Sequence, residues 1–351
     1  MKKLIVILLI FCIISSFGLV VAEENTDPVI WKSKINSWVP FVTATNDGAY
    51  TAASSLDGSF YYFDKSGNLL WNSNVGHRVV SLSILEDYSK VTAVTGEKIY
   101  IFNSSGTQLN EYKSVKGGFM TITPDGAYIG GSSSNSYAMV YKDGKPLWDY
   151  KTEDKVNYVS ITPDGQTLAI ASSDNNVYLI RSGLLLWKYD TKMPVISVAV
   201  TPNSSYLVCG TGSLESKEGD APKDYRIYLF DGNGKLLWDQ KIGYTVTSVS
   251  MTPDGSYIAV GAWDKKVHVF SKTGEHLREF KTEGNVWSVS ITPDGKNVVA
   301  GSTDTYVYFL DVESMPTPEK SSKFNPTYIA IPLLIILASG ALIYTKKIKK
   351  K

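Results

Sequence analysis

Cysteine and histidine are scarce in this chain. The 351 residues include two cysteines, Cys12 and Cys209, and three histidines, His77, His268 and His276. Cys12 lies in an apolar run near the N-terminus, and Cys209 lies in an apolar strand pattern without a second cysteine to pair with. We interpret Cys209 as a buried, inert thiol. The three histidines show no metal-ligand spacing, so the sequence predicts neither an internal disulfide nor a metal site.

Motifs that carry catalysis are missing as well. We find no nucleophile beside a general base and no glycine-rich phosphate loop. Aspartates do recur at evenly spaced turns, where their side chains bond to nearby backbone. We interpret them as turn residues and not as calcium ligands, which would have to gather at one place. The sequence predicts no catalytic residue and no cofactor.

An excess of basic residues is also absent from the body of the chain. The formal net charge is +1, but seven of the 35 basic residues lie in the two ends. Residues 23–345 hold 28 basic against 34 acidic residues, a net charge of −6. A mildly acidic body argues against nucleic acid as a partner.

The N-terminal end has the pattern of a secretory signal. Two lysines precede an apolar run that closes on Val20-Val21-Ala22 before the acidic Glu23. Residues 1–22 are therefore predicted to be a signal peptide, and an uncleaved N-terminal anchor is the alternative.

The C-terminal end has the pattern of a membrane anchor. Residues 312–326 are rich in proline, serine and charge, as in a linker. Residues 327–345 are predicted to be a transmembrane helix, because the uncharged apolar core 328–344 would span about 25 Å. Residues 346–351 form a basic tail, which favours the cytoplasm. We expect a single-pass protein of the cell membrane with its body outside the cytoplasm.

The body is a sevenfold repeat. A turn signal related to Thr-Pro-Asp-Gly recurs at steps of 40, 38, 39, 39, 51 and 40 residues. A period of about 40 residues is typical of a propeller blade of four strands, or of a solenoid. The turns begin at Thr45, Leu85, Thr123, Thr162, Thr201, Thr252 and Thr292.

Each repeat predicts four strands. The third is rich in β-branched and aromatic residues, as in 307–311, and the fourth usually carries a tryptophan that we expect to pack between blades. The seventh unit lacks a fourth strand, and Ile30-Trp31-Lys32 would supply it from the other end of the chain. The predicted fold is all-β: residues 23–311 form a seven-bladed β-propeller that an N-terminal strand closes.

The repeats resemble two known families. The unit from Val286 to Asp311 resembles the WD repeat, although no third strand ends in the tryptophan of that motif and its Gly-His pair survives only at Gly76-His77. Residues 231–238 resemble the quinoprotein (PQQ-type) repeat. The first resemblance implies a binding platform more often than an enzyme. The second implies a PQQ-dependent dehydrogenase, but those enzymes generally have eight blades and a vicinal cysteine pair, which this chain lacks.

One face of the propeller collects residues that do not repeat. Chain direction predicts that the loops between the second and third strands, and those between blades, face away from the membrane. This face would hold Trp38, His77, Arg78, Trp263 and Trp287, together with an acidic insertion at 212–224 that would form a mobile flap.

We therefore hypothesise a non-catalytic scaffold at the cell surface that binds a protein or a glycan through this aromatic patch. Two alternatives stay open. The tryptophans could plug the channel or pack locally, and the propeller could be an architectural component of the cell envelope.

Overall fold

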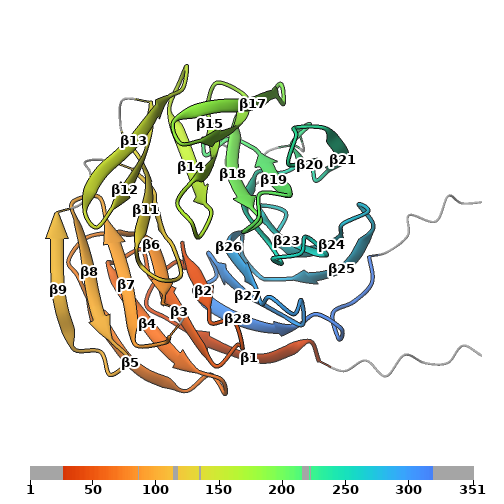
Figure 1. The fold of residues 1–351 in the computed structure, drawn as a ribbon. Helices are drawn as coiled ribbons and strands as arrows, with labels where there is room; N and C mark the ends of the chain where they lie inside the picture. Colours follow the sequence, from red (N-terminus) through yellow and green to blue (C-terminus); the bar gives the residue numbers. More distant parts are fainter. Residues whose placement is uncertain are drawn as a thin grey trace, which may run out of the picture. The chain divides into compact units, whose positions relative to one another are not determined.

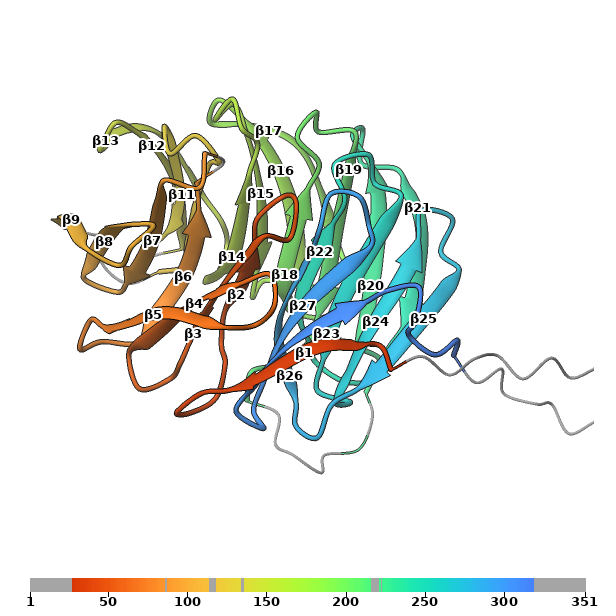
Figure 2. The same ribbon diagram turned by 90° about the horizontal axis from the view of Figure 1, so that it is seen from below.

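The computed structural model describes residues 27–318, apart from residue 86 and residues 114–117, 134–135, 216–220 and 222. In this part, 28 strands form seven four-stranded antiparallel sheets, which are arranged as blades in a ring (Figures 1 and 2). The predicted seven-bladed, all-β propeller is confirmed. A compact unit runs to Pro316, and only two residues beyond it are described.

The strands of a blade follow one another outward from the centre of the ring. Blades one to four comprise β2 (Val42–Ala44), β3 (Tyr50–Ser54), β4 (Ser59–Asp64) and β5 (Leu69–Asn74); β6 (Val79–Ile84), β7 (Lys90–Thr95), β8 (Lys98–Asn103) and β9 (Gln108–Lys113); β10 (Met120–Ile122), β11 (Tyr128–Ser132), β12 (Tyr137–Lys142) and β13 (Lys145–Lys151); β14 (Val156–Ile161), β15 (Thr167–Ser172), β16 (Asn176–Arg181) and β17 (Leu184–Asp190).

Blades five to seven continue the same order. They comprise β18 (Val195–Val200), β19 (Tyr206–Thr211), β20 (Arg226–Asp231) and β21 (Leu236–Lys241); β22 (Val246–Met251), β23 (Tyr257–Ala262), β24 (Lys266–Ser271) and β25 (His276–Lys281); β26 (Val286–Ile291), β27 (Asn297–Ser302), β28 (Tyr306–Asp311) and β1 (Val29–Lys34).

The N-terminal strand completes the last blade, as the sequence predicted. β1 pairs antiparallel with β28, from Val29 opposite Leu310 to Lys34 opposite Tyr306. The backbone N–H of Asp311 donates to the carbonyl of Pro28 at 2.8 Å, so the two ends of the propeller lie side by side.

The repeated turns owe their geometry to one small network. In blade six, the Thr252 hydroxyl donates to the Asp254 carboxylate at 2.7 Å and accepts the backbone N–H of Tyr257 at 3.1 Å. The Asp254 carboxylate also accepts the backbone N–H of Ser256, and Gly255 adopts a positive φ of 74°. The aspartates are therefore held as turn residues, which supports the interpretation from sequence.

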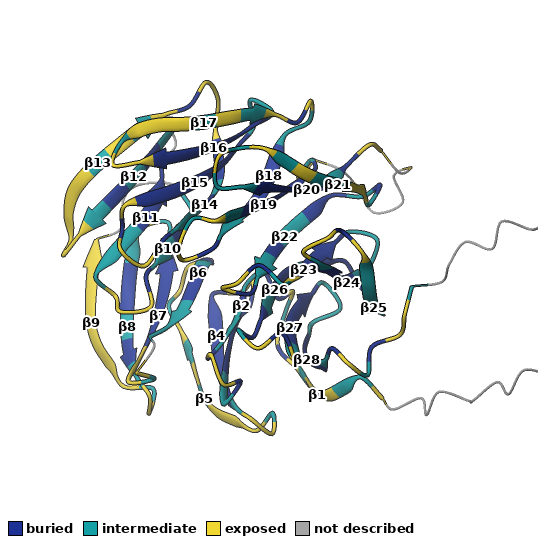
Figure 3. Cartoon of the chain, turned by 45° about the vertical axis from the view of Figure 1, so that its right-hand side comes forward, coloured by how far each residue is buried: buried dark blue, intermediate teal, exposed yellow. Residues whose placement is uncertain are grey.

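The hydrophobic core lies between blades. One cluster joins Leu179 of blade four to Val198, Leu207 and Cys209 of blade five. Burial is greatest in the second and third strands of each blade, and the outermost strands are mostly exposed or partly exposed (Figure 3). The Cys209 thiol is fully buried and unpaired, and this burial raises its pKa. Each sheet thus buries its faces against its neighbours, which lets one domain of this length form a continuous core.

The fourth-strand tryptophans connect successive blades through a contact that we call the Trp–Gly contact. Trp71 of blade one lies against Gly106 in the last hairpin of blade two, so closely that a Cβ on Gly106 would approach the indole to 2.8 Å. The Trp71 Nε1–H donates to the carbonyl of Ser104 in the same hairpin at 2.9 Å. The same close approach joins Trp187 to Gly234, Trp238 to Gly274 and Trp31 to Gly67, and the indoles of Trp187 and Trp238 also make the hydrogen bond.

Several predictions concern residues that the structure does not describe. The signal peptide (1–22), most of the linker (312–326), the transmembrane helix (327–345) and the basic tail (346–351) lie outside the described residues, as does the middle of the insertion. In the described part, no helix is long and apolar enough to span a membrane.

The Trp–Gly contact can be tested by replacing a glycine. Gly106→Ala should lower the free energy of unfolding by about 2–4 kcal/mol, because it adds a steric clash with Trp71 to the strain of a positive φ. Gly144 is the matched control, since it has φ of 75° but no neighbouring atom within 4 Å of the position that a Cβ would occupy. Gly144→Ala should cost only about 1 kcal/mol in urea denaturation. If Gly106→Ala and Gly144→Ala lowered the free energy of unfolding equally, the proposed role of the Trp–Gly contact would be wrong.

The turn network predicts an acid-sensitive contribution to stability. Hydrogen bonds from the Ser256 hydroxyl, the Ser256 backbone and Thr252 lower the pKa of Asp254 to about 2. A carboxyl whose folded pKa is depressed stabilises the fold above its ordinary pKa near 4, and this stabilisation is lost as the pH falls towards 2. Asp254→Asn, which introduces the residue found at Asn203 of blade five, should keep the turn but lose less stability than wild type between pH 4 and 2. The prediction would be contradicted if thermal unfolding showed the same loss of stability for the variant and the wild type between pH 4 and 2.

Candidate functional site

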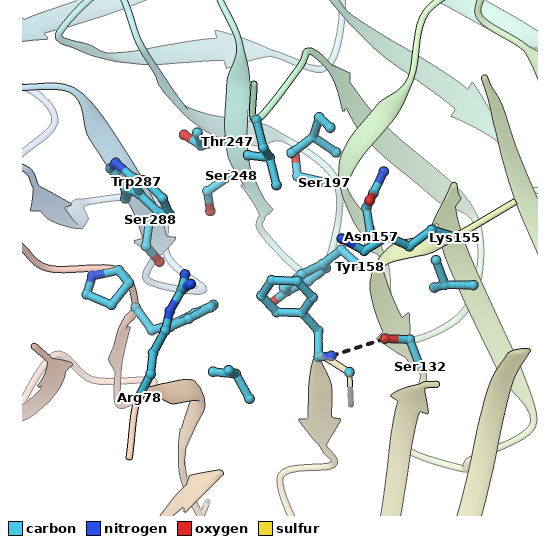
Figure 4. Close-up of a pocket in the computed structure, with 18 of the residues that line it drawn as sticks. Arg78, Ser132, Lys155, Asn157, Tyr158, Ser197, Thr247, Ser248, Trp287 and Ser288 are labelled. Carbon is cyan, nitrogen blue, oxygen red and sulfur yellow. Dashed lines mark hydrogen bonds between the residues drawn. The ribbon is translucent and has the colours of Figure 1, made fainter. Parts of the chain in front are cut away.

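A cavity opens at the centre of the ring. Its volume is about 690 Å³, and all seven blades contribute to its lining (Figure 4). Most of the lining comes from the start of each innermost strand or from the residues just before it. These residues include Phe41, Val80, Phe119, Tyr158, Ile196, Val249 and Trp287.

The cavity lies at the end of the blades opposite to the point where the chain enters and leaves. In blade seven, Val286 at the start of β26 pairs with Ser302, whereas Asp311 pairs with Asn297 at the other end of the sheet. Trp287, which lines the cavity, therefore lies at one end of the sheet, and the neighbouring Pro28 and Asp311 lie at the other.

Three tryptophans from neighbouring blades form a row beside this opening. The rings of Trp38 and Trp287 lie 6.3 Å apart, and those of Trp263 and Trp287 lie 6.1 Å apart. Trp38 comes from the segment before blade one, Trp263 from a turn of blade six and Trp287 from the first strand of blade seven. Trp38 is 46% exposed, and the other two are partly buried. We call these three residues the tryptophan row.

Arg78 lines the cavity and contacts the tryptophan row at Trp287. Its guanidinium lies 5.9 Å from the centre of the Trp287 ring, and Figure 4 shows it beside that residue in the cavity. No ion pair of Arg78 occurs among the described residues, and desolvation lowers the pKa of its side chain. Arg78 and Lys155 are the charged residues among the described lining, and both are positive. The opening therefore favours a negatively charged group.

Four of the five residues predicted for the patch are thus brought together. The fifth, His77, is exposed, and its ring lies 4.0 Å from the Glu97 carboxylate, outside the lining of the cavity. The described start of the insertion also reaches the opening, because Leu214 lines the cavity and Ser213 bonds to Thr245. The acidic residues at 218 and 220 lie outside the described part.

Sequence reasoning missed a second group of aromatic residues in the lining. Phe119 lies 5.9 Å from Phe41 and 5.8 Å from Tyr158, measured between ring centroids. All three stand four residues before the repeated turn, where the other four blades carry Ser81, Ser197, Ser248 and Ser288. Alignment of the repeats at this position could therefore have found them.

The serines of the lining are mostly structural. The Ser288 hydroxyl accepts the backbone N–H of Val42 in the next blade at 3.2 Å, and Ser248 accepts that of Val289 at 3.1 Å. Ser197 donates to the carbonyl of Val246 at 3.2 Å. These hydroxyls join neighbouring innermost strands, and no lining serine of the described part has a histidine beside it that would activate it.

Comparison with known families identifies three of the repeats. Residues 144–181, 240–271 and 274–311 match the WD domain, G-beta repeat family. The first and third matches run from the fourth strand of one blade through the first three strands of the next, and the second begins within the fourth strand. A comparison with curated proteins found no match to the chain.

Trp263 of the row and Trp238 of the Trp–Gly contact differ in how their indole N–H is bonded, and replacing each indole with a benzene ring tests this difference. Trp263 Nε1 is buried without a hydrogen-bond partner, whereas Trp238 Nε1–H donates to the Lys272 carbonyl at 2.8 Å. Both Trp→Phe changes remove ring volume, but only Trp238→Phe removes a hydrogen bond. We expect Trp238→Phe to be more destabilising by about 1 kcal/mol in urea denaturation. A larger loss in Trp263→Phe would show that its indole N–H has a partner.

Proposed function

The chain contains WD40 repeats within a seven-bladed β-propeller, and we propose that it is a non-catalytic scaffold that binds a segment of a partner protein across the central opening. WD40 propellers are typically protein-interaction scaffolds. The observation that carries the proposal is the continuous contact of the tryptophan row with Arg78 at the rim of the cavity.

The chemistry of the opening suits an acidic segment with an apolar anchor. Tryptophan and arginine are the residues most enriched at binding hot spots, where they supply large contact areas and directed hydrogen bonds. An aromatic or aliphatic side chain would cover the tryptophan row. A carboxylate would pair with the Arg78 guanidinium, which has no carboxylate partner in the described part, and Lys155 would add to the attraction.

A protein segment fits the opening better than a glycan. Sugar hydroxyls must be both donors and acceptors of hydrogen bonds, and they need free polar groups around them. The hydroxyls of Ser197, Ser248 and Ser288 each already make one hydrogen bond between blades. Most of the other lining side chains are aromatic or aliphatic, and the charged ones are the two cations.

For the location, we propose that the propeller lies outside the cytoplasm and is held at the cell membrane by residues 327–345. This proposal rests on the sequence patterns of residues 1–22, 327–345 and 346–351. Pro28 and Asp311 lie side by side at the end of the ring opposite the cavity. An anchor that followed them would leave the opening directed away from the membrane.

A crosslinking pull-down with the full-length chain tests the binding surface. Replacing Trp38, Trp263 and Trp287 together by Ala should weaken capture of the partner by at least about 30-fold, the effect of losing one hot spot of about 2 kcal/mol. Arg78→Gln should weaken it less and should reduce its sensitivity to salt. Tyr112→Ala is the matched control, because Tyr112 is 54% exposed on the outermost strand of blade two, away from the opening.

Unfolding curves of every variant separate a loss of binding from a loss of fold. Partner capture that survives the triple substitution would reject the surface. If the wild type and all the variants captured the same set of cell-envelope proteins, this would support the architectural alternative instead.

A further inference from the structure

A pair of histidines meets in blade six, away from the central cavity. His268 lies on β24 and His276 on β25, with 3.2 Å between His268 Nδ1 and His276 Nε2. A carboxylate oxygen of Glu279 completes a set of three donor atoms that all lie within 4.8 Å of one another. Among the residues that the structure describes, His268, His276 and Glu279 are the group of histidine and carboxylate side chains close enough together to hold a metal ion.

A β-bulge brings these three side chains onto one face. On a regular strand, His276 and Glu279 would point to opposite faces, because their spacing is odd. The register of β24 and β25 shifts between Val269 and Phe270, so that Glu279 lies opposite His268 while His276 lies opposite Phe270. One extra residue on β25 thus turns His276 to the side of Glu279. The spacing of these residues in the sequence does not reveal the arrangement, because it depends on the bulge.

The distances fit a metal ion. Two ligands of a tetrahedral zinc ion, each about 2.0–2.1 Å from it, are about 3.3 Å apart. The 3.2 Å between the facing nitrogens agrees with this separation. Imidazole nitrogens and a carboxylate oxygen form a donor set that suits zinc better than magnesium or calcium, which prefer oxygen ligands alone.

An outer carboxylate orients the first ligand. Asp264 Oδ2 lies 2.9 Å from His268 Nε2, and the two side chains are only 15% and 6% exposed. A carboxylate there accepts the Nε2–H, which leaves the lone pair of Nδ1 directed at His276. Metal-ligating histidines almost always make such a bond through their other nitrogen.

Other blades have a tyrosine in the place of His268. Tyr178 and Tyr308 take the place of His268 in blades four and seven, and each donates to the aspartate four residues before it, at 2.6 and 2.8 Å. The contact with Asp264 therefore does not require a histidine. What His268 adds is a second ring nitrogen on the side of His276.

Blade two is an internal reference for the site. Lys98, Tyr100, Gln108 and Glu111 have the same spacing as Lys266, His268, His276 and Glu279. The lysine–glutamate ion pair is present in both, at 2.6 Å in blade two and 2.7 Å in blade six. The two blades thus share a backbone arrangement and an ion pair, and they differ at the two positions that carry nitrogen ligands in blade six.

We propose that blade six binds a divalent transition-metal ion, zinc by its donor set, through His268 Nδ1, His276 Nε2 and the Glu279 carboxylate. Both facing nitrogens must offer a lone pair, so His276 carries its ring proton on Nδ1 in the bound form. Three protein ligands leave a fourth position open to water or to a side chain of another protein. The ammonium of Lys266 competes for Glu279 and keeps the affinity moderate.

Metal titration of the full-length chain, purified without a histidine tag, tests the site. Zn²⁺ titrated in competition with a chromophoric chelator should bind at one equivalent, and Co²⁺ should give the visible absorption of a tetrahedral site. The double variant H268Y/H276Q, which carries the residues of blade two, should bind at least 100-fold more weakly. Glu279→Gln should weaken binding about 10-fold or more, and Lys266→Met should strengthen it.

Thermal unfolding supplies the controls. Zn²⁺ should raise the Tm of the wild type and leave that of H268Y/H276Q unchanged, while the two proteins should melt as folded propellers without metal. His77→Gln should bind as the wild type does. The proposal fails if the wild type takes up no Zn²⁺ or Co²⁺, if H268Y/H276Q takes up as much as the wild type, or if uptake is lost in His77→Gln instead.

Discussion

The Trp–Gly contact is the constraint on which the rest of this structure depends. A blade of four strands is apolar on both faces and cannot bury them alone, so each face must be covered by a neighbour. The indole of one blade lies flat over a glycine of the next, and in three blades its N–H also bonds to a carbonyl of that next hairpin. Only glycine leaves room for this approach. The contact sets how closely two blades approach at the four junctions where it occurs, which are Trp31–Gly67, Trp71–Gly106, Trp187–Gly234 and Trp238–Gly274.

The last junction uses the same device with a residue from the other end of the chain. Trp31 lies over Gly67 of blade one and stacks on Phe309 of blade seven, with 5.4 Å between their rings. Closure therefore places blades six, seven and one beside one another, and the tryptophan row is a consequence of that neighbourhood. The candidate binding surface depends on the closure of the ring as much as the fold does.

Much of the fold and part of the candidate binding surface could be predicted, because the sequence repeats. The Thr-Asp-Gly turns set the number of blades, and the missing fourth strand of the last unit pointed to residues 30–32. Proximity on the ring also brought Trp38, Trp263, Trp287 and Arg78 together. Side-chain details that depend on register could not be predicted in this way. The pairing of His268 with His276 depends on a bulge. The lining aromatics Phe41 and Phe119 could have been found from the repeat, because four other blades carry serine at the same position.

The pairing of β1 with β28 also has a consequence for synthesis on the ribosome. Residues 29–34 are made among the first of the propeller, and their partners at 306–311 are made last. The apolar side of the early strand must therefore stay unpaired while about 270 residues emerge, at rates that imply tens of seconds. Blades one to six can form in sequence during translation, but the ring can close only after the final strands have left the exit tunnel. This interval is when the nascent chain is most exposed to misassociation and most in need of a chaperone.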